Sequence, residues 1–136
     1  MKLISHNFNP ETGETILYLG NSTGIYKGIS KFNPVDIGKP SEIFGGDLAE
    51  LRAWLSFYKK ELSKNKAKLK ILDSLKRDIL NFCTKEVSNS ATRRILIFEK
   101  EQKKKIEENK TMIDFIKKEI KTYINHKDAH IKDKKD

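Results

Sequence analysis

Apolar residues recur at intervals of three and four in the second part of the chain. One stripe, with polar gaps near positions 65 and 76, consists of Leu48, Leu51, Leu55, Tyr58, Leu62, Leu69, Leu72, Ile79 and Phe82. A second stripe consists of Ile95, Phe98, Gln102, Ile106, Asn109, Ile113, Ile116, Ile120 and Tyr123. This near-heptad spacing is typical of the buried face of a coiled-coil helix. No Pro or Gly follows Gly46, so each stripe predicts a helix of about 35 residues, which is about 50 Å long.

A short polar break at residues 87–92 separates the two stripes. A break of this length predicts that the helices turn back on each other as a long antiparallel two-helix coiled-coil hairpin. Asp47, with Glu50 three residues later, is expected to cap the first helix. Ser88 and Ser90 are expected to cap the second helix.

The first 46 residues follow a different pattern, because they alternate apolar and polar positions over short stretches. KLISHNF, ETILYLG and GIYKGIS are separated by NPETG and NSTG, which contain the residues that turns require. These stretches predict a small three-stranded antiparallel β-meander. A loop is expected over residues 33–44, where Pro34 and Pro40 block regular structure.

The whole pattern predicts an α+β fold in a single domain covering residues 1–136. Its parts are the β-meander and loop at 1–46, the helical hairpin at 47–126 and a charged, frayed tail at 127–136. Apolar residues outside the two stripes also need cover; they are Trp54, Phe57, Leu75, Leu96, Ile97 and Phe115. Because the small sheet cannot reach the far end of the hairpin, we predict a homo-oligomer, a dimer or higher, that buries them.

Positive charge is concentrated in the predicted helices. The formal net charge is +9, of which residues 1–46 contribute zero, residues 47–86 contribute +4 and residues 87–136 contribute +5. Such a balance favours an anionic partner, such as a nucleotide or a nucleic acid. A lysine-rich, solvated helix surface in a chain from an AT-rich genome explains the charge equally well.

Several classes of function find no support in the sequence. No apolar run approaches the roughly 20 residues that span a membrane, and MKLISHNFNP lacks the apolar segment of a signal peptide. We therefore expect a cytoplasmic protein that binds no membrane. Cys83 is the single cysteine, and the three histidines (His6, His126 and His130) form no metal-ligand pattern, so neither a metal nor a cofactor is expected. The chain has no P-loop and no paired carboxylates flanking a histidine, which argues against an enzyme.

Two adjacent arginines, Arg93 and Arg94, stand at the expected start of the second helix. Guanidinium groups and free backbone N–H groups both bind phosphates, so we predict a ligand site here. Phe82, across the same loop, is placed to stack on a purine. Ser88 and Asn89 are placed to bind ribose hydroxyls or the edge of a base.

A structural interpretation of this region stays open. In it, Phe82 plugs the end of the hairpin, the two arginines pair with Glu86 and Glu99, and Ser90 only caps the helix.

A second basic cluster combines Lys27 and Lys31, near the end of the third strand, with Arg52 in the first helix. An arginine that points back toward the sheet would complete a basic notch for an anion. The alternative is that the lysines are ordinary surface residues and that Arg52 pairs with Asp47 or Glu50.

Four short motifs resemble those of small phage proteins that share one layout. They are SHNFNPETG (5–13), GISKFNP (28–34), GGDLAELRA (45–53) and ATRRILIFEKE (91–101). Together they resemble the first-described Thoeris anti-defence proteins of phages. The resemblance implies a sponge that sequesters cyclic ADP-ribose isomers made by bacterial TIR-domain defence enzymes, and in some members cyclic oligonucleotides, without chemistry on the ligand. It also implies assembly from dimers, with ligands in pockets between subunits.

Two other interpretations remain. A basic coiled-coil module that binds DNA or RNA would show binding that weakens steeply with salt. A structural phage protein, such as a head or tail adaptor, would use its apolar stripes only for assembly.

Overall fold

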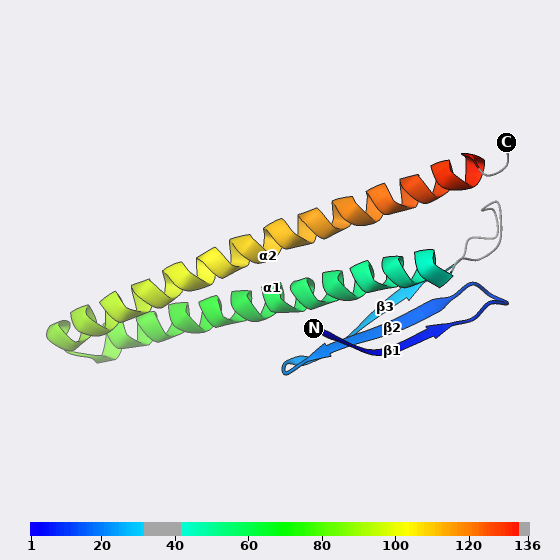
Figure 1. Cartoon of the computed structure of the whole chain (residues 1–136). Coiled ribbons are helices and arrows are strands. Elements are labelled where there is room, and N and C mark those ends of the chain that lie inside the picture. The colour runs from blue at the N-terminus through cyan, green and yellow to red at the C-terminus, as the bar shows by residue number, and fades with distance from the viewer. Residues whose placement is uncertain (32–41, 134–136) are drawn as a thin grey trace. The chain divides into compact units, whose positions relative to one another are not determined.

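The computed structural model describes residues 1–31 and 42–133. Its elements are β1 (Lys2–Phe8), β2 (Thr15–Asn21), β3 (Gly24–Ser30), α1 (Glu42–Phe82) and α2 (Lys85–Asp133). The predicted α+β layout is confirmed, because a three-stranded antiparallel sheet precedes two long helices that pack together (Figure 1). Most of the expected loop over residues 33–44 lies outside the described residues. The chain divides into two compact units: Met1–Phe57 with Ile113–Asp136, here the sheet unit, and Tyr58–Met112, here the hairpin unit.

The sheet has the order β1–β2–β3, and each strand runs antiparallel to the next. In the NPETG turn, the side-chain oxygen of Asn9 accepts a hydrogen bond from the Glu11 backbone N–H at 3.0 Å. Gly13 has a φ of 73°, which residues with a Cβ rarely adopt. Asn21 acts like Asn9 in the second turn and accepts a hydrogen bond from the Thr23 N–H at 2.8 Å. Both turns predicted from the sequence therefore form.

One face of the sheet packs against the beginning of α1 (Figure 1). Leu17 and Leu19 of β2 form a buried cluster with Ala49 and Ala53 of α1. Gly28 of β3 faces the same helix, and a Cβ atom built on it would overlap the carbonyl oxygen of Ala49. Small residues on both elements therefore allow strand and helix to approach closely and form the core of the sheet unit.

The first helix begins earlier than predicted, at Glu42 rather than at Asp47. Gly45 and Gly46 lie inside the helix, and a Cβ atom on Gly45 would lie 2.5 Å from Thr15 Oγ1. From the sequence, this glycine pair is expected at the boundary between the loop and the first helix. The structure shows instead that the pair marks the place where helix and sheet touch.

The residue expected to cap α1 has a different partner. The carboxylate of Asp47 accepts a hydrogen bond from Tyr123 Oη at 2.6 Å, which joins α2 to the beginning of α1 within the sheet unit. The predicted capping box with Glu50 is therefore wrong. The second helix also extends to Asp133, so the segment expected to fray from residue 127 is helical; residues 134–136 lie outside the described part.

The helices of the hairpin unit pack along the predicted stripes, with two polar pairs among the apolar residues. Asn65 Nδ2 donates a hydrogen bond to Asn109 Oδ1 at 2.7 Å. The ammonium of Lys76 lies 3.9 Å from the carboxylate of Glu99. These pairs fall at the polar gaps near positions 65 and 76. Isolated polar pairs in a coiled-coil seam are known to fix which residues face each other.

Two members of the predicted stripes are placed wrongly. Phe98 is 55% exposed, whereas its neighbour Glu99 is 6% exposed. Glu99 lies four residues after Ile95 and three before Gln102, so heptad spacing favours the carboxylate position over the aromatic one. Phe82, expected to end the first stripe, is 85% exposed, because α1 ends at this residue.

Candidate functional site

The connection between the helices places the two adjacent arginines differently from the prediction. α2 begins at Lys85, after a connection formed by residues 83–84 rather than 87–92. Arg93 and Arg94 therefore lie in the third turn of α2, beyond the first four N–H groups that a helix leaves free. The prediction that arginines and free N–H groups form one cradle at a helix start is wrong.

Ser88 stabilises the end of α1 instead of beginning α2. Its N–H donates to the carbonyl oxygen of Thr84 at 2.8 Å, as inside a helix. Its hydroxyl Oγ donates to the carbonyl oxygens of Ile79 at 3.1 Å and of Cys83 at 3.4 Å. The residue is 5% exposed, so it does not have the accessible position that ligand binding requires. Ser90, the other expected cap, lies within the helix.

The two arginines are exposed and unengaged. Among the described residues, neither Arg93 nor Arg94 forms a hydrogen bond or an ion pair. The carboxylate of Glu99 lies near Lys76 instead, and Glu86 forms no ion pair with a described residue. The alternative in which carboxylates of the same chain neutralise the arginines is therefore wrong for the described part of the chain.

Arg94 lines a hollow of about 430 Å³ in the hairpin unit, which we call the Arg94 hollow. Its complete lining is Leu75, Ile79, Val87, Ser90, Ala91, Arg94 and Ile95. The volume lies in the range of small-molecule sites, which combine apolar walls with a few polar groups. Arg94 and Ser90 supply the polar groups here, and the remaining five residues supply an apolar wall.

The other residues predicted around the arginines are exposed but do not line this hollow. Phe82 presents most of its ring at the end of α1. Asn89 is exposed on α2, where no hydrogen bond of its side chain is formed with a described residue. Arg93 is the immediate neighbour of Arg94 but lies outside the lining. The structure therefore separates Arg94 from the rest of the predicted group.

The second basic cluster forms in part. Arg52 Nη1 donates to the backbone carbonyl oxygen of Ile29 at 2.7 Å, so this arginine does point back toward β3. Burial lowers the pKa of its guanidinium from the ordinary value. Lys27 is exposed and lies 5.9 Å from the ring centre of Tyr18, and Lys31 is exposed directly after β3. None of these three side chains lines the described hollows at the β1–β2 turn or in the hairpin unit.

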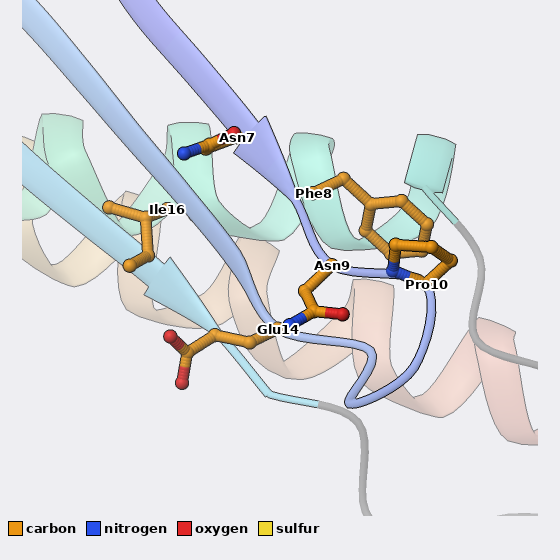
Figure 2. A pocket seen from close by; sticks show the side chains of 6 residues that line it. All are labelled: Asn7, Phe8, Asn9, Pro10, Glu14 and Ile16. Atoms are coloured by element: carbon orange, nitrogen blue, oxygen red, sulfur yellow. The ribbon is translucent and has the colours of Figure 1, made fainter.

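A further hollow, of about 370 Å³, lies at the β1–β2 turn. Figure 2 shows its lining: Asn7, Phe8, Asn9, Pro10, Glu14 and Ile16. The Asn9 side-chain oxygen, one of the polar groups here, is engaged in the turn. This hollow is explained by the turn and shows no basic side chain among its lining residues.

The segment GNSTG, at 20–24, has the G-x-S-x-G spacing of a nucleophile elbow, which requires a strand-to-helix turn. Here the segment joins β2 to β3, with Asn21 paired to Gly24. It is therefore a hairpin turn, as predicted from the sequence.

Three buried oxygen atoms on the inner face of α2 were not predicted from the sequence. Thr92 Oγ1, Glu99 Oε1 and Gln102 Oε1 are inaccessible to solvent and lack a hydrogen-bond partner among the described residues. Gln102 was assigned to the seam, but its unused acceptor was not anticipated. The sequence contained a sign of this, because Gln102 is a polar residue in an apolar stripe. A buried polar side chain either forms a hydrogen bond with a partner or leaves that hydrogen bond unformed.

Among the described residues, no helix is both long and apolar enough to cross a membrane, and no group of three His, Cys, Asp or Glu side chains is arranged to hold a metal ion. The side chains of His126 and His130 lie outside the described part.

No family model, curated protein or solved structure matches the chain.

Proposed function

We propose that this protein binds and sequesters a small phosphorylated nucleotide signal, of the cyclic ADP-ribose type, without cleaving it. The observation that carries the proposal is the Arg94 hollow: an arginine with no partner in the described part of the chain lines a largely apolar hollow of nucleotide-compatible size. A guanidinium binds phosphate oxygens through two parallel hydrogen bonds. The apolar lining residues suit the face of a base or the carbons of a ribose.

The lining of the Arg94 hollow also favours binding over catalysis. None of its seven residues is an acid, a histidine or a cysteine, so the hollow supplies neither a general base nor an activated nucleophile. A protein that removes a signal by holding it needs affinity alone. A host-cell cytoplasmic location, where such signals act, belongs to the same proposal.

The proposal includes a homo-oligomer. The hollow is open to solvent, and exposed apolar side chains surround it, among them Leu75 and Val87. A second copy placed over this region would enclose the ligand and bury these side chains. An enclosed site whose walls are already ordered favours tight binding, because little conformational entropy is lost when the ligand binds.

The first experiment measures binding of cyclic ADP-ribose and its isomers by isothermal titration calorimetry. Arg94→Gln is expected to weaken binding about 10- to 100-fold, which is the range expected for loss of a charged hydrogen bond. Arg77→Gln is the matched control, because Arg77 is also exposed in the hairpin unit but does not line the hollow. An unchanged Kd for Arg94→Gln, or no binding by the wild type, would contradict the proposal.

A second candidate function, binding of nucleic acid, is favoured by the consecutive exposed lysines Lys103, Lys104 and Lys105 on α2. The same protein is titrated with duplex DNA at several salt concentrations. Affinity that falls steeply with salt and depends no more on Arg94 than on Arg77 would support this candidate over the nucleotide sponge.

A further inference from the structure

The sheet has a second face, opposite the one that packs against α1. Burial alternates along β2 and β3, because successive residues of a strand point to opposite faces. Leu17 and Leu19 pack against α1, so Tyr18 between them lies on the opposite face, which we call the outer face. None of the residues discussed for the Arg94 hollow belongs to this face.

Strand register places an aromatic ring and a cation side by side on the outer face. Tyr18 is half-buried on β2, the central strand, and is paired with Ser5 on β1 and Lys27 on β3. Side chains of directly paired residues lie close together on one face. The Lys27 ammonium lies 5.9 Å from the centre of the Tyr18 ring, which is close to the outer limit of a cation–π contact.

Aliphatic side chains extend this patch along the strands. A Cβ atom built on Gly20 of β2 would overlap the side chain of Ile4, so Ile4 lies on the outer face where Gly20 leaves room for it. Ile25 of β3 pairs with Gly20. Ile4 is 54% exposed and Ile25 is 64% exposed. The outer face therefore presents an aromatic ring beside accessible apolar surface, on which flat rings pack well.

The charges of the sheet favour an anionic partner. The three strands contain Lys2 and Lys27 but no acidic residue, and Lys31 follows directly after β3. All three lysines are exposed, and none forms an ion pair with a described residue. The acidic Glu14 precedes β2 and lines the hollow at the β1–β2 turn.

Apolar surface and positive charge together distinguish between possible partners. A second copy of this face would bring like charges together, and a neutral apolar partner would leave the lysines unused. Single-stranded nucleic acid satisfies both features, because its bases stack on aromatic side chains and its phosphates attract lysines. Some RNA-binding sheets stack bases on the aromatic residues of an exposed face in this way.

We propose that the outer face of the sheet binds single-stranded nucleic acid. One base stacks on Tyr18, and a neighbouring base covers Ile4 and Ile25. Lys27 moves from the ring to a phosphate, which its flexible side chain allows. This site goes beyond the proposed function and is independent of the Arg94 hollow, which lies in the hairpin unit.

Fluorescence anisotropy with a short fluorescein-labelled oligothymidylate tests the proposal. The wild type should bind this strand more tightly than the same strand paired with oligodeoxyadenylate, because a duplex keeps its bases away from Tyr18. Tyr18→Thr, which suits an exposed strand position, should weaken binding about tenfold, as loss of one stacked base predicts. Tyr18→Phe keeps the ring and should bind like the wild type. Phe115→Ala is the matched control, because Phe115 is an exposed aromatic residue of α2 in the same unit.

The phosphate contact has a readout of its own. Lys27→Gln should lower the slope of log affinity against log salt concentration by about 0.7, the value for one phosphate contact with a single strand. Lys118→Gln, at an exposed position of α2 in the sheet unit, should leave the slope unchanged.

Three results would overturn the proposal: a wild type that does not bind the strand, equal affinity for strand and duplex, or binding that Tyr18→Thr and Lys27→Gln leave unchanged. The last two would assign the binding to the lysines of the hairpin unit. None of the three bears on capture of a nucleotide at Arg94, which is measured separately.

Discussion

At the scale of single residues, two hydroxyl groups make hydrogen bonds that connect α1 with α2. The hydroxyl of Ser88 donates hydrogen bonds to carbonyl groups at the end of α1. The connection between the helices lies just before this residue, at 83–84, whereas the polar segment at 87–92 predicted it several residues later. Tyr123 plays a comparable part in the sheet unit, where its hydroxyl donates to Asp47. Both residues connect α1 with α2, and neither role follows from residue type alone.

The Tyr123 contact predicts a dependence of stability on pH. Burial, and then the hydrogen bond and charge of Asp47, raise the pKa of Tyr123 above its ordinary value of 10.0. The unfolded chain therefore loses this proton at lower pH than the folded chain does. The stabilisation is fully present below pH 10 and is lost as pH rises toward the folded-state pKa.

Urea unfolding of the wild type and of Tyr123→Phe at several pH values measures this effect. Below pH 9 the wild type is expected to be more stable by about 1 kcal/mol, which is typical of one hydrogen bond. The difference should shrink above pH 10, because only the wild type loses this contact. Two curves that stay parallel up to pH 11 would show that the Tyr123 hydroxyl does not contribute as described.

At the scale of elements, the seam of the hairpin unit contains polar groups that pair across the two helices. Asn65 is 5% exposed, and its amide donates to Asn109. Glu99 is also buried, with Lys76 as its neighbour. Paired in this way, the polar residues oppose any sliding of one helix along the other, since a shifted hairpin would bury each of them against apolar side chains.

The Asn65–Asn109 pair predicts a pattern in a double-mutant cycle. Asn65→Leu alone should lower the free energy of unfolding by about 1–3 kcal/mol, because it leaves the Asn109 amide in the seam without its partner. The double variant with Asn109→Leu should recover most of that loss, because an apolar pair then replaces the polar one. Asn81→Leu, at an exposed position, is the control and should change stability little.

Urea denaturation measures the cycle, and a double variant as unstable as either single one would contradict it. Alignment of the helices is measured by spin-label distances between α1 and α2. These distances should broaden in the double variant, whose seam no longer distinguishes one alignment from its neighbours.

The sequence predicted the elements well, because a turn motif or a repeating stripe is carried by many residues at once. Predictions that depended on a single position were less secure. Glu99 replaced Phe98 in the seam because spacing outweighed side-chain polarity. Gly45 and Gly46 suggested the boundary of a helix. Their actual role, close contact with the sheet, could not be predicted because the contacting residues are far away in the sequence. The Arg94 hollow depends on both helices, and their alignment is visible only in three dimensions.

At the scale of the whole molecule, the apolar surface exceeds what the described chain covers. Four successive apolar residues occupy 95–98 on α2, and only Ile95 is buried. Leu96 is 48% exposed and Ile97 is 61% exposed. A helix that is apolar on all sides normally has neighbours on all sides. Contiguous surface of this kind marks an interaction site, and the proposed second copy would cover it.

Sedimentation velocity tests the assembly directly. The wild type should sediment as a dimer or a larger species of the 15.8 kDa chain, and Ile97→Glu should shift it toward the monomer, because burial of a charge at an apolar interface is costly. Lys118→Glu, an exposed position in the sheet unit, serves as the control for the added negative charge. A wild type that remains monomeric throughout the tested concentrations would contradict the prediction.

The two-residue connection between the helices has a practical consequence. It contains Cys83, which is exposed and is the single cysteine of the chain. A thiol-reactive fluorophore would therefore attach at one place, within the unit that also holds the Arg94 hollow. The native chain thus offers a handle for an optical readout of ligand capture without an engineered attachment point.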